Sequence, residues 1–541
     1  MTIESAPIRP PSYPAFKNEP FTDFSEERHR NAFKRALEHV ESLRVTKPFV
    51  VRPIVEGVPS ETGEIVVRRD PSDSSMELCN IHFASVQIAE RALVSLKDGF
   101  PRWRARPSTA RIAAIRRLAQ AMREQKEYLS ALIIREVGKT WREADADVAE
   151  AIDFCDYYAL VAEKMALPEL TEKVLGEENH YFYQPRGIVA VISPWNFPLA
   201  ITCGMTVAAL IVGNCVVLKP AEQSSLIAAE FARLVLESGV SGSAFAFLPG
   251  LGETVGRHLV SHQDVAMIAF TGSRPVGFEI IRSAGEVRTG QTSIKRVVAE
   301  LGGKNCVIVD EDADMDDAVR GIIQSAFGFA GQKCSACSRV VAVGSAYEPL
   351  LARLAAATKD LIIGNASDPS SFLGPVVDAE SCQRINDTIA LGKSELNLLA
   401  ELPLPLALKG RGSYVAPTVF MDVPVTHPIW REEIFGPVLA CTKAATFDEA
   451  LAIANDSVYA LTGGVFSRHP GHLAKAREEF RVGNLYINRS ITGALVGRQP
   501  FGGFGFSGIG SKAGGPDYLL QFVEPRVVTE NTMRRGFTPD L

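Results

Sequence analysis

Short apolar runs alternate with longer amphipathic stretches from about residue 187 onward. The runs are rich in Val and Ile and carry almost no charge, which is typical of strands buried on both faces of a sheet. Such strand–helix–strand repetition predicts parallel sheets covered by helices. A first series of expected strands spans residues 188–193, 215–218, 244–248, 267–270 and 297–299, and a second spans 306–310 and 339–343, followed by a helix at 348–359.

Two α/β domains in tandem are the economical arrangement of these two series. Ahead of them, the pattern predicts an arm over roughly the first sixty residues, with a helix at 25–42. Another helix is expected at 109–126, where Ile112, Ile115 and Leu118 recur at helical spacing.

The stretch 199–218 contains no charged residue and is long enough to cross a bilayer. Gly213 and Asn214 supply a turn signal in its middle, and Lys219 and Pro220 follow its end. We therefore interpret it as a buried helix, a turn and a buried strand, and we predict no membrane partner.

Composition narrows the class of protein. A length of 541 residues predicts about two to four domains, and 46% hydrophobic with 22% charged residues excludes disorder of the whole chain. The formal net charge of -6 argues against a nucleic-acid binder that works by bulk electrostatics.

Cysteine usage indicates a reducing compartment. The first residues lack a basic segment followed by an apolar run, so no secretory signal is expected. The nine cysteines are odd in number and irregular in spacing, which favours free thiols and a cytoplasmic location. Cys334 and Cys337 form a lone CxxC without a second pair, so no metal site is predicted.

One cysteine nevertheless lies in a setting suited to nucleophilic chemistry. Cys334 follows Gly331 and Gln332 and is surrounded by small polar residues, which leave its thiol accessible. Attack by a thiolate requires a pKa lowered by a helix dipole, a cation or local amides. Lys333 is adjacent, but we expect its side chain to point elsewhere. Considered by itself, such a segment is more often structural.

Two further motifs close predicted strands. Glu300 begins the sequence ELGGK, and a carboxylate at a strand end facing a crevice suits a general base. Asn196 lies in PWNFP, where its amide can donate to a developing oxyanion beside a helix N-terminus. The structural alternatives are a solvated turn for the first motif and a rigid proline-bounded turn, with Trp195 and Phe197 in the core, for the second.

Two more polar segments end strands of the first series. Lys219 and Glu222 follow one strand, and Gly272 and Ser273 follow another. Ligands of open α/β sheets bind at this edge, where backbone N–H groups at a helix start can hold a phosphate. No convincing GxGxxG is present, and the glycines between 250 and 256 are interpreted as a turn.

The order of these motifs strongly resembles that of the aldehyde dehydrogenase superfamily, over about residues 100–522. The resemblance implies an aldehyde dehydrogenase-like fold: two doubly wound α/β domains with a small β oligomerisation flap. In that family PWNFP carries the oxyanion asparagine, ELGGK the general base and GQxC the nucleophile. The catalytic roles would then belong to Asn196, Glu300 and Cys334.

The resemblance also implies NAD as cofactor, held without a Rossmann glycine fingerprint by the helix that follows Gly272 and Ser273. We expect Glu222 to favour NAD over NADP, because its carboxylate would repel a 2′-phosphate. The residues expected to bind NAD are Ser193, Pro194, Trp195, Lys219, Glu222, Gly252, Gly256, Thr271, Gly272, Ser273, Leu301, Gly302, Glu433 and Phe435.

A narrower resemblance concerns the substrate. The segments GQKCSACSR at 331–339 and TGALVGRQPFGG at 492–503 look like those of the L-glutamate γ-semialdehyde dehydrogenases, which act on 1-pyrroline-5-carboxylate in the second step of proline catabolism. SKAGGP at 511–516 and FKNEPF at 16–21 continue the match, whereas 54–65 shows no such pattern and 501–510 varies in its middle. The resemblance implies substrate binding by Phe197, Lys333, Ser335, Gly493, Ala494 and Phe501.

The same resemblance sets expectations for organisation and partners. A hairpin at about 170–185 and a strand at 520–528 should form the flap of a homo-oligomer that is at least a dimer. Proline dehydrogenase is the expected pathway partner, and the chain is too short to include it, so a monofunctional enzyme is expected. The predicted segments are an arm and first part of the NAD domain (1–168), a hairpin (169–186), the NAD-binding core (187–300), a catalytic domain (301–496), a return to the NAD domain (497–515) and a C-terminal oligomerisation strand (516–541).

Two alternatives remain open at this level. The enzyme can be an NAD(P)-dependent dehydrogenase of another semialdehyde, such as succinate semialdehyde, although the 492–503 segment favours the glutamate compound. The other alternative is a non-catalytic structural protein on the same fold, against which intact Asn196, Glu300 and Cys334 argue.

Overall fold

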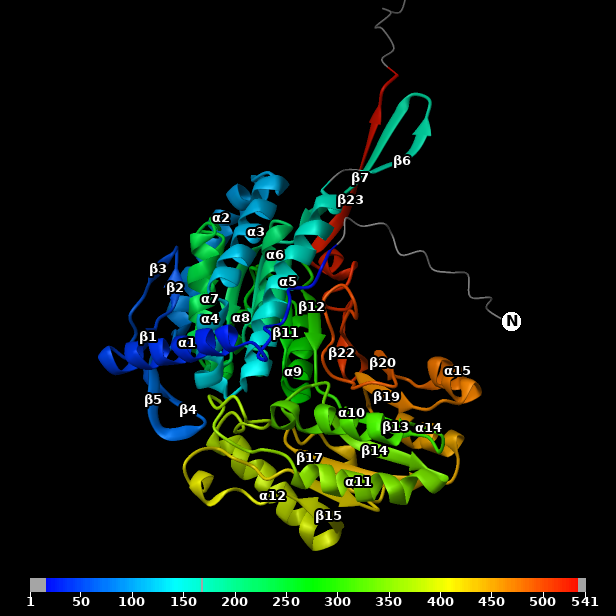
Figure 1. Ribbon diagram of the computed structural model, residues 1–541. Helices are drawn as coiled ribbons and strands as arrows, with labels where there is room; N and C mark the ends of the chain where they lie inside the picture. Colours follow the sequence, from blue (N-terminus) through cyan, green and yellow to red (C-terminus); the bar gives the residue numbers. More distant parts are fainter. Residues whose placement is uncertain (1–15, 167–168, 534–541) are drawn as a thin grey trace, which may run out of the picture.

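The computed structural model describes residues 16–166 and 169–533, and two large sheets organise most of them (Figure 1). The first sheet has eight strands in the order β22-β12-β11-β8-β9-β10-β2-β3. Its centre, from β12 to β10, is parallel throughout, as the strand–helix alternation predicts. The strands are β2 (Ile54–Val55), β3 (Val58–Pro59), β8 (Ile188–Ile192), β9 (Cys215–Lys219), β10 (Phe245–Phe247), β11 (Val265–Thr271), β12 (Arg296–Glu300) and β22 (Gly508–Ile509).

The second sheet has seven strands in the order β15-β16-β17-β14-β13-β19-β20. All its neighbours are parallel except β15 and β16. The strands are β13 (Asn305–Val309), β14 (Cys337–Val343), β15 (Asn397–Glu401), β16 (Thr418–Met421), β17 (Val438–Ala444), β19 (Thr462–Phe466) and β20 (Asn484–Ile487).

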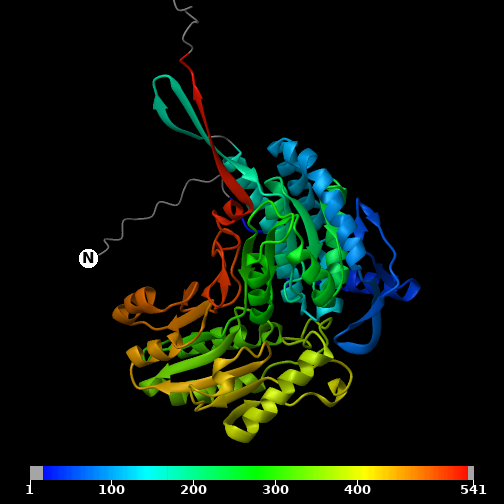
Figure 2. The same ribbon diagram turned by 180° about the vertical axis from the view of Figure 1, so that it is seen from behind.

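Helices pack on both sheets, and buried apolar side chains form two separate clusters, one around each sheet (Figure 1 and Figure 2). The expected fold of two doubly wound α/β units is therefore confirmed. The helices of the first unit are α1 (Glu27–Thr46), α2 (Val86–Ala105), α3 (Ser108–Glu124), α4 (Lys126–Val137), α5 (Trp141–Met165), α6 (Ala200–Ile211), α7 (Ser225–Glu237), α8 (Arg257–Ser261) and α9 (Arg274–Gly285). Those of the second are α10 (Met315–Phe327), α11 (Tyr347–Lys359), α12 (Ala379–Glu395), α13 (Pro428–Arg431), α14 (Phe447–Asn455) and α15 (Pro470–Glu479).

The apolar stretch 199–218 folds as the sequence predicts. It forms α6 and then β9, and Gly213 between them adopts φ +103°, a left-handed conformation that favours glycine. Within residues 16–166 and 169–533, no helix is both long and apolar enough to cross a membrane.

A three-stranded antiparallel sheet projects from the body (Figure 1). It consists of β6 (Glu169–Val174), β7 (Glu177–Pro185) and β23 (Val523–Asn531), with β7 in the middle. The strand expected from 520 begins only at Val523, because Tyr518–Phe522 form a 3-10 helix whose apolar residues are largely buried. Two smaller sheets are formed by β1 (Phe49–Val51), β5 (Asp73–His82) and β4 (Ile65–Asp70), and by β18 (Tyr459–Ala460) and β21 (Phe504–Gly505).

Strand register gathers the polar strand ends of the first sheet. Ile192 pairs with Lys219 and with Phe270, and Thr271 pairs with Glu300. Because these strands are parallel, their carboxyl ends lie at one edge of the sheet, which is where ligands of such sheets bind.

Candidate active site

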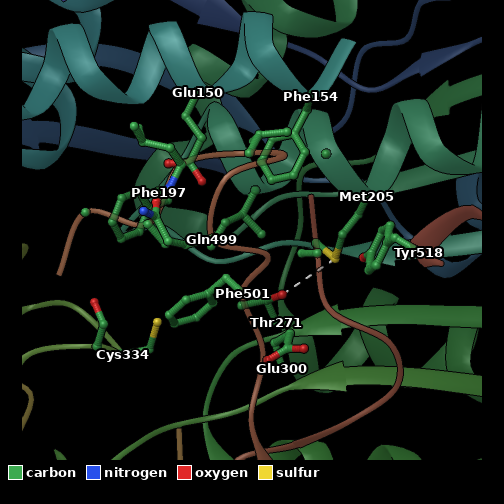
Figure 3. A pocket seen from close by; sticks show the side chains of 18 of the residues that line it. Glu150, Phe154, Phe197, Met205, Thr271, Glu300, Cys334, Gln499, Phe501 and Tyr518 are labelled. Atoms are coloured by element: carbon green, nitrogen blue, oxygen red, sulfur yellow. Dashed lines mark hydrogen bonds between the residues drawn. The ribbon is translucent and has the colours of Figure 1, made fainter. Parts of the chain in front are cut away.

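Cys334 and Glu300 face the same pocket (Figure 3). Glu300 is the last residue of β12 in the first sheet, whereas Cys334 lies just before β14 in the second. The two sheets thus contribute one group each. Other pocket residues include Glu150, Phe154, Phe197, Met205, Thr271, Leu301, Ser335, Gly493, Ala494, Gln499, Phe501 and Tyr518.

A sharp turn brings Cys334 into the pocket. Phe329, Ala330 and Gly331 adopt φ values of 51°, 52° and 71°. Left-handed conformations of non-glycine residues cost on the order of 1–3 kcal/mol each and persist only where the surroundings impose them. The Asn305 amide donates to the Cys334 carbonyl oxygen at 2.7 Å, which fixes the end of the turn.

The thiol environment differs from the sequence expectation. Burial, and then the carboxyl groups of Glu300 and Glu433, raise the pKa of Cys334 to about 12. The adjacent cation does not oppose this rise, because Lys333 Nζ lies 2.7 Å from Glu143 Oε1, turned away as predicted. Cys334 therefore keeps its proton at neutral pH in this state, and attack requires that the proton be accepted elsewhere.

Glu300 is a suitable proton acceptor. Burial raises its pKa to about 8, against the opposing effects of Lys512 and of a hydrogen bond from the Gly503 N–H. Its Oε2 atom has no hydrogen-bond partner in the described part of the chain. A carboxyl group that changes protonation near neutral pH is suited to general acid–base work.

The Asn196 side chain points toward the loop of the cysteine. Its Nδ2 donates to the Gln332 carbonyl oxygen at 3.1 Å, and the residue is buried. The segment that carries it is held at its far end, where the Ala200 N–H at the start of α6 donates to Asp147 Oδ1 at 2.7 Å.

A buried ion pair lies beneath this segment. Lys139 Nζ lies 2.9 Å from Asp147 Oδ2, and both side chains are fully buried. The same Nζ is 3.9 Å from the centre of the Phe197 ring and 5.0 Å from that of Phe329. A cation so close to aromatic faces is attracted to both, so this pair fixes the Phe197 wall of the pocket.

Five of the six residues expected to bind substrate line the pocket, namely Phe197, Ser335, Gly493, Ala494 and Phe501. Gly493 has φ +76°, so the turn is one that glycine favours. The sixth residue, Lys333, does not line this pocket, because its side chain pairs with Glu143.

Sequence reasoning missed Glu150. It lies on α5, lines the pocket, and has its pKa raised to about 8 by burial and by the nearby Asp147. Glu143, Asp147 and Glu150 recur at helical spacing on a largely buried helix that also buries Asp145 and Asp153, and so many acidic residues are unusual for a buried helix. That pattern was available in the sequence.

Several residues expected to bind the dinucleotide meet at a second cavity. Glu222 Oε1 lies 3.0 Å from Lys219 Nζ and accepts from the Gly252 N–H at 2.9 Å. Gly252 and Gly256 line a cavity between the segment that leads into α8 and helix α9. An acidic group thus lies beside this cavity.

Other expected dinucleotide residues lie at strand ends of the first sheet. Ser193 Oγ is buried without a hydrogen-bond partner in the described part of the chain. Gly272 and Ser273 directly precede α9, so their amides belong to a helix start. Thr271 and Leu301 line the Cys334 pocket, which links it to this edge of the sheet.

Glu433 is held close to the ELGGK turn. Its Oε1 accepts from the Gly303 N–H at 2.8 Å, and a Cβ atom on Gly302 would lie only 2.0 Å from its Oε2. Glycine at 302 therefore permits this approach. Nearby, the rings of Trp195 and Phe435 pack edge to face with centres 5.5 Å apart.

Comparisons with known proteins agree with this geometry. Curated relatives named 1-pyrroline-5-carboxylate dehydrogenase include one from Geobacillus sp. (strain WCH70), 45% identical over 515 residues that cover 95% of this chain and 99% of the relative. The 1-pyrroline-5-carboxylate dehydrogenase 2 of Bacillus subtilis (strain 168) is 43% identical over 516 residues, with the same coverage.

Solved structures give the same result. A 1-pyrroline-5-carboxylate dehydrogenase from Thermus with bound NAD is 44% identical, with a TM-score of 0.92 over 96% of this chain and 100% of that one. Proline utilization A from Bdellovibrio bacteriovorus is 45% identical with a TM-score of 0.94, and this chain spans 54% of its length. The model of the aldehyde dehydrogenase family matches residues 58–528, so the chain belongs to the aldehyde dehydrogenase family.

Proposed function

We propose that the protein is an NAD-dependent dehydrogenase that oxidises L-glutamate γ-semialdehyde, formed from 1-pyrroline-5-carboxylate, to L-glutamate. This reaction is the second step of proline catabolism. The observation that carries the proposal is one pocket that holds Cys334, Glu300 and the Gly493–Ala494 turn, in a chain 45% identical to a 1-pyrroline-5-carboxylate dehydrogenase.

Cys334 is the nucleophile in this proposal. Its thiol proton passes to the Glu300 carboxylate, which lines the same pocket, and the sulfur adds to the aldehyde carbon. The resulting oxyanion is stabilised by the Asn196 amide and the Cys334 backbone N–H. Loss of one such donor typically slows a reaction by about 10²–10³-fold.

The residues at the edge of the first sheet fit NAD. The unpartnered buried Ser193 hydroxyl, the Gly252–Gly256 cavity and the amides before α9 offer polar contacts to a dinucleotide. The chemistry that NAD supplies when bound is acceptance of the hydride from the substrate carbon, after which the acyl group remains on Cys334 as a thioester.

Glu300 first releases the thiol proton to solvent, and its carboxylate then activates water to hydrolyse the thioester and release L-glutamate. Its carboxylate form accepts a proton from the water, and a pKa of about 8 makes that form accessible at mildly alkaline pH. The unpartnered Oε2 leaves one oxygen free for this water.

The pocket suits an amino acid chain. Backbone N–H groups of the Gly493–Ala494 turn and the Ser335 hydroxyl are proposed to bind the α-carboxylate, and Phe197 and Phe501 to flank the methylenes. Glu150 is proposed to face the α-ammonium, whose positive charge would favour the ionised carboxylate.

Glu222 is proposed to favour NAD over NADP. It already pairs with Lys219 and accepts from Gly252, so a 2′-phosphate would meet a carboxylate whose neighbouring lysine is already paired. A kcat/KM for NADP equal to or above that for NAD would contradict this assignment.

We also propose that the chain self-associates through the projecting sheet of β6, β7 and β23. Leu170, Leu175 and Val527 on it are 52%, 96% and 58% exposed, and burial of such apolar side chains against a partner surface is favourable.

Because the proposed nucleophile is a free thiol, we propose that the enzyme works in the reducing cytoplasm and that proline dehydrogenase supplies its substrate. We further propose that residues 187–300 bind the cofactor and that residues 301–496 carry the nucleophile.

The decisive experiment is NADH absorbance with glutamate semialdehyde and a panel of other aldehydes. We expect kcat/KM to be highest for glutamate semialdehyde and clearly lower for succinate semialdehyde. A higher value for succinate semialdehyde would overturn the substrate, and no NADH from any aldehyde would overturn the activity.

A further inference from the structure

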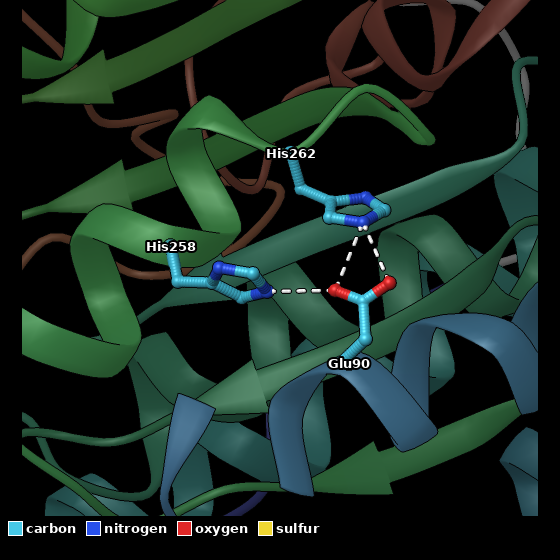
Figure 4. Close-up of side chains that lie close together, drawn as sticks. All are labelled: Glu90, His258 and His262. Carbon is cyan, nitrogen blue, oxygen red and sulfur yellow. Dashed lines mark hydrogen bonds and ion pairs between the residues drawn. The ribbon is translucent and has the colours of Figure 1, made fainter. Parts of the chain in front are cut away.

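Two histidines and a glutamate converge outside the Cys334 pocket (Figure 4). Glu90 projects from α2, His258 from α8, and His262 directly follows α8. Glu90 Oε2 lies 3.1 Å from His258 Nε2 and 3.2 Å from His262 Nε2. We propose that Glu90, His258 and His262 form a binding site for a divalent transition-metal ion, with Zn²⁺ as the best-matched ion.

The ligand types and spacing support a metal. Imidazole nitrogen and carboxylate oxygen bind Zn²⁺ at about 2.0–2.2 Å, so ligand atoms of a tetrahedral site lie about 3.3–3.5 Å apart. The two nitrogen–oxygen distances are close to this edge length. His258 and His262 are four positions apart, which places both rings on one side of a helical turn.

The site is also open to an ion from solution. The side chains of His258, His262 and Glu90 are 22%, 10% and 50% exposed, so the rings are positioned by packing while the carboxylate faces solvent. Three protein ligands leave the fourth tetrahedral position for water. An ordinary surface ion pair looks different: His427 meets Glu395 at 3.0 Å, with one histidine for one carboxylate.

Metal binding has one local cost. The Asp264 N–H donates to Nδ1 of His262 at 3.2 Å, so the proton of the neutral ring belongs on Nε2, which faces Glu90. When an ion binds Nε2, the proton of the neutral ring moves to Nδ1. Nδ1 can then no longer accept the hydrogen bond from the Asp264 N–H, and this bond is lost. The Asp264 amide should therefore exchange with solvent faster when the metal is bound.

The location suggests a consequence for the dinucleotide, and this consequence rests on the proposed function. Helix α8 continues directly from Gly252–Gly256, and both line one wall of the cavity proposed for NAD. An ion that joins α8 to α2 would hold this wall in place. Preorganisation of that kind should lower the KM for NAD about two- to fivefold.

The test is a Co²⁺ titration of the full-length protein, followed by absorption, because Co²⁺ reports tetrahedral nitrogen and oxygen ligands by its d–d bands. It is done in the Cys334→Ala background so that the reactive thiol does not compete. We expect one equivalent to bind, Zn²⁺ to displace it, and His258→Ala and Glu90→Ala each to weaken binding at least about tenfold. His427→Ala is the matched control and should bind Co²⁺ as the background does.

Three results would overturn the site: no d–d bands at millimolar Co²⁺, equal binding by the His258→Ala variant, or sulfur-to-metal charge-transfer bands that show thiol ligands. His262→Gln serves as a second ligand variant of similar size if an alanine variant unfolds, and thermal unfolding reports folding in each case. Because the titration needs neither substrate nor NAD, its failure speaks only against the metal site, whereas absence of NADH formation speaks only against the proposed activity.

Discussion

Buried ionisable groups form ion pairs in one region of the molecule and lack such partners in a neighbouring region. Beneath the Phe197 wall, Lys139 pairs with Asp147 at 2.9 Å and Lys333 with Glu143 at 2.7 Å. In the pocket itself, Glu300 has an oxygen without a hydrogen-bond partner in the described part of the chain, and its pKa is raised to about 8. The ion pairs hold their neighbours in place, and against the effect of burial Lys333 and Lys139 keep the pKa of Glu143 below its usual range, although burial raises the pKa of Asp147. The unpaired carboxyl group of Glu300 titrates near neutral pH.

The comparison suggests a division between groups that react and groups that position them. The two kinds lie close together because Asp147 caps α6, which follows the Asn196 segment, while Lys139 contacts the Phe197 ring. Variants of the unpaired groups in the pocket should therefore lose turnover, whereas variants of the ion pairs beneath the Phe197 wall should lose stability.

The largest effect is expected from removal of the proposed nucleophile. Cys334→Ala should lower kcat for NADH formation by about 10⁴-fold or more, because among the described residues no other cysteine lines this pocket. Cys337→Ala is the matched control, since this thiol is buried nearby and should keep activity within about tenfold. Similar losses in both variants would contradict a special role for Cys334.

The next effect concerns the unpaired carboxyl group. Glu300→Gln should lower kcat by about 10²–10⁴-fold, because both deprotonation of the thiol and activation of water lose their base. In the wild type, kcat should rise as the pH increases through about 8, because only the carboxylate accepts a proton from water. A variant that retains this rise would show that another group is the base.

Removal of a paired charge should damage stability before chemistry. Lys139→Met leaves Asp147 buried without its cation and should lower the free energy of unfolding by about 3–5 kcal/mol in urea denaturation. Lys139→Met combined with Asp147→Asn should recover part of that loss.

The control for this prediction is an exposed pair. Lys97 meets Asp264 at 2.8 Å with 60% of the lysine side chain exposed, so Lys97→Met should cost less than about 1 kcal/mol. Equal costs for the two lysines would remove the basis for the comparison.

The smallest effect tests substrate recognition. Glu150→Gln should raise the KM for glutamate semialdehyde about tenfold, because the amide offers the α-ammonium no charge. Succinate semialdehyde has no amino group, so its KM should not change. A parallel rise for both aldehydes would indicate a general defect of the pocket.

Much of the fold was readable from local pattern. The apolar runs predicted β8, β9, β11, β13 and β14 to within a few residues, because strands buried on both faces must be continuously apolar. The strand expected from 520 begins later, at Val523, because burial of Tyr518–Phe522 favours a helical turn there. Apolar composition alone does not distinguish these two outcomes.

The order of motifs along the chain was enough to identify the family and to nominate Asn196, Glu300 and Cys334, since each motif is local and its residue types are tied to a chemical step. Tertiary structure decided the electrostatics. Lys333 pairs with Glu143, and Lys139 contacts both Asp147 and Phe197. No local sequence motif specifies these contacts. The raised pKa of Cys334 and the place of Glu150 in the pocket follow from burial, and burial is set by how distant elements pack together.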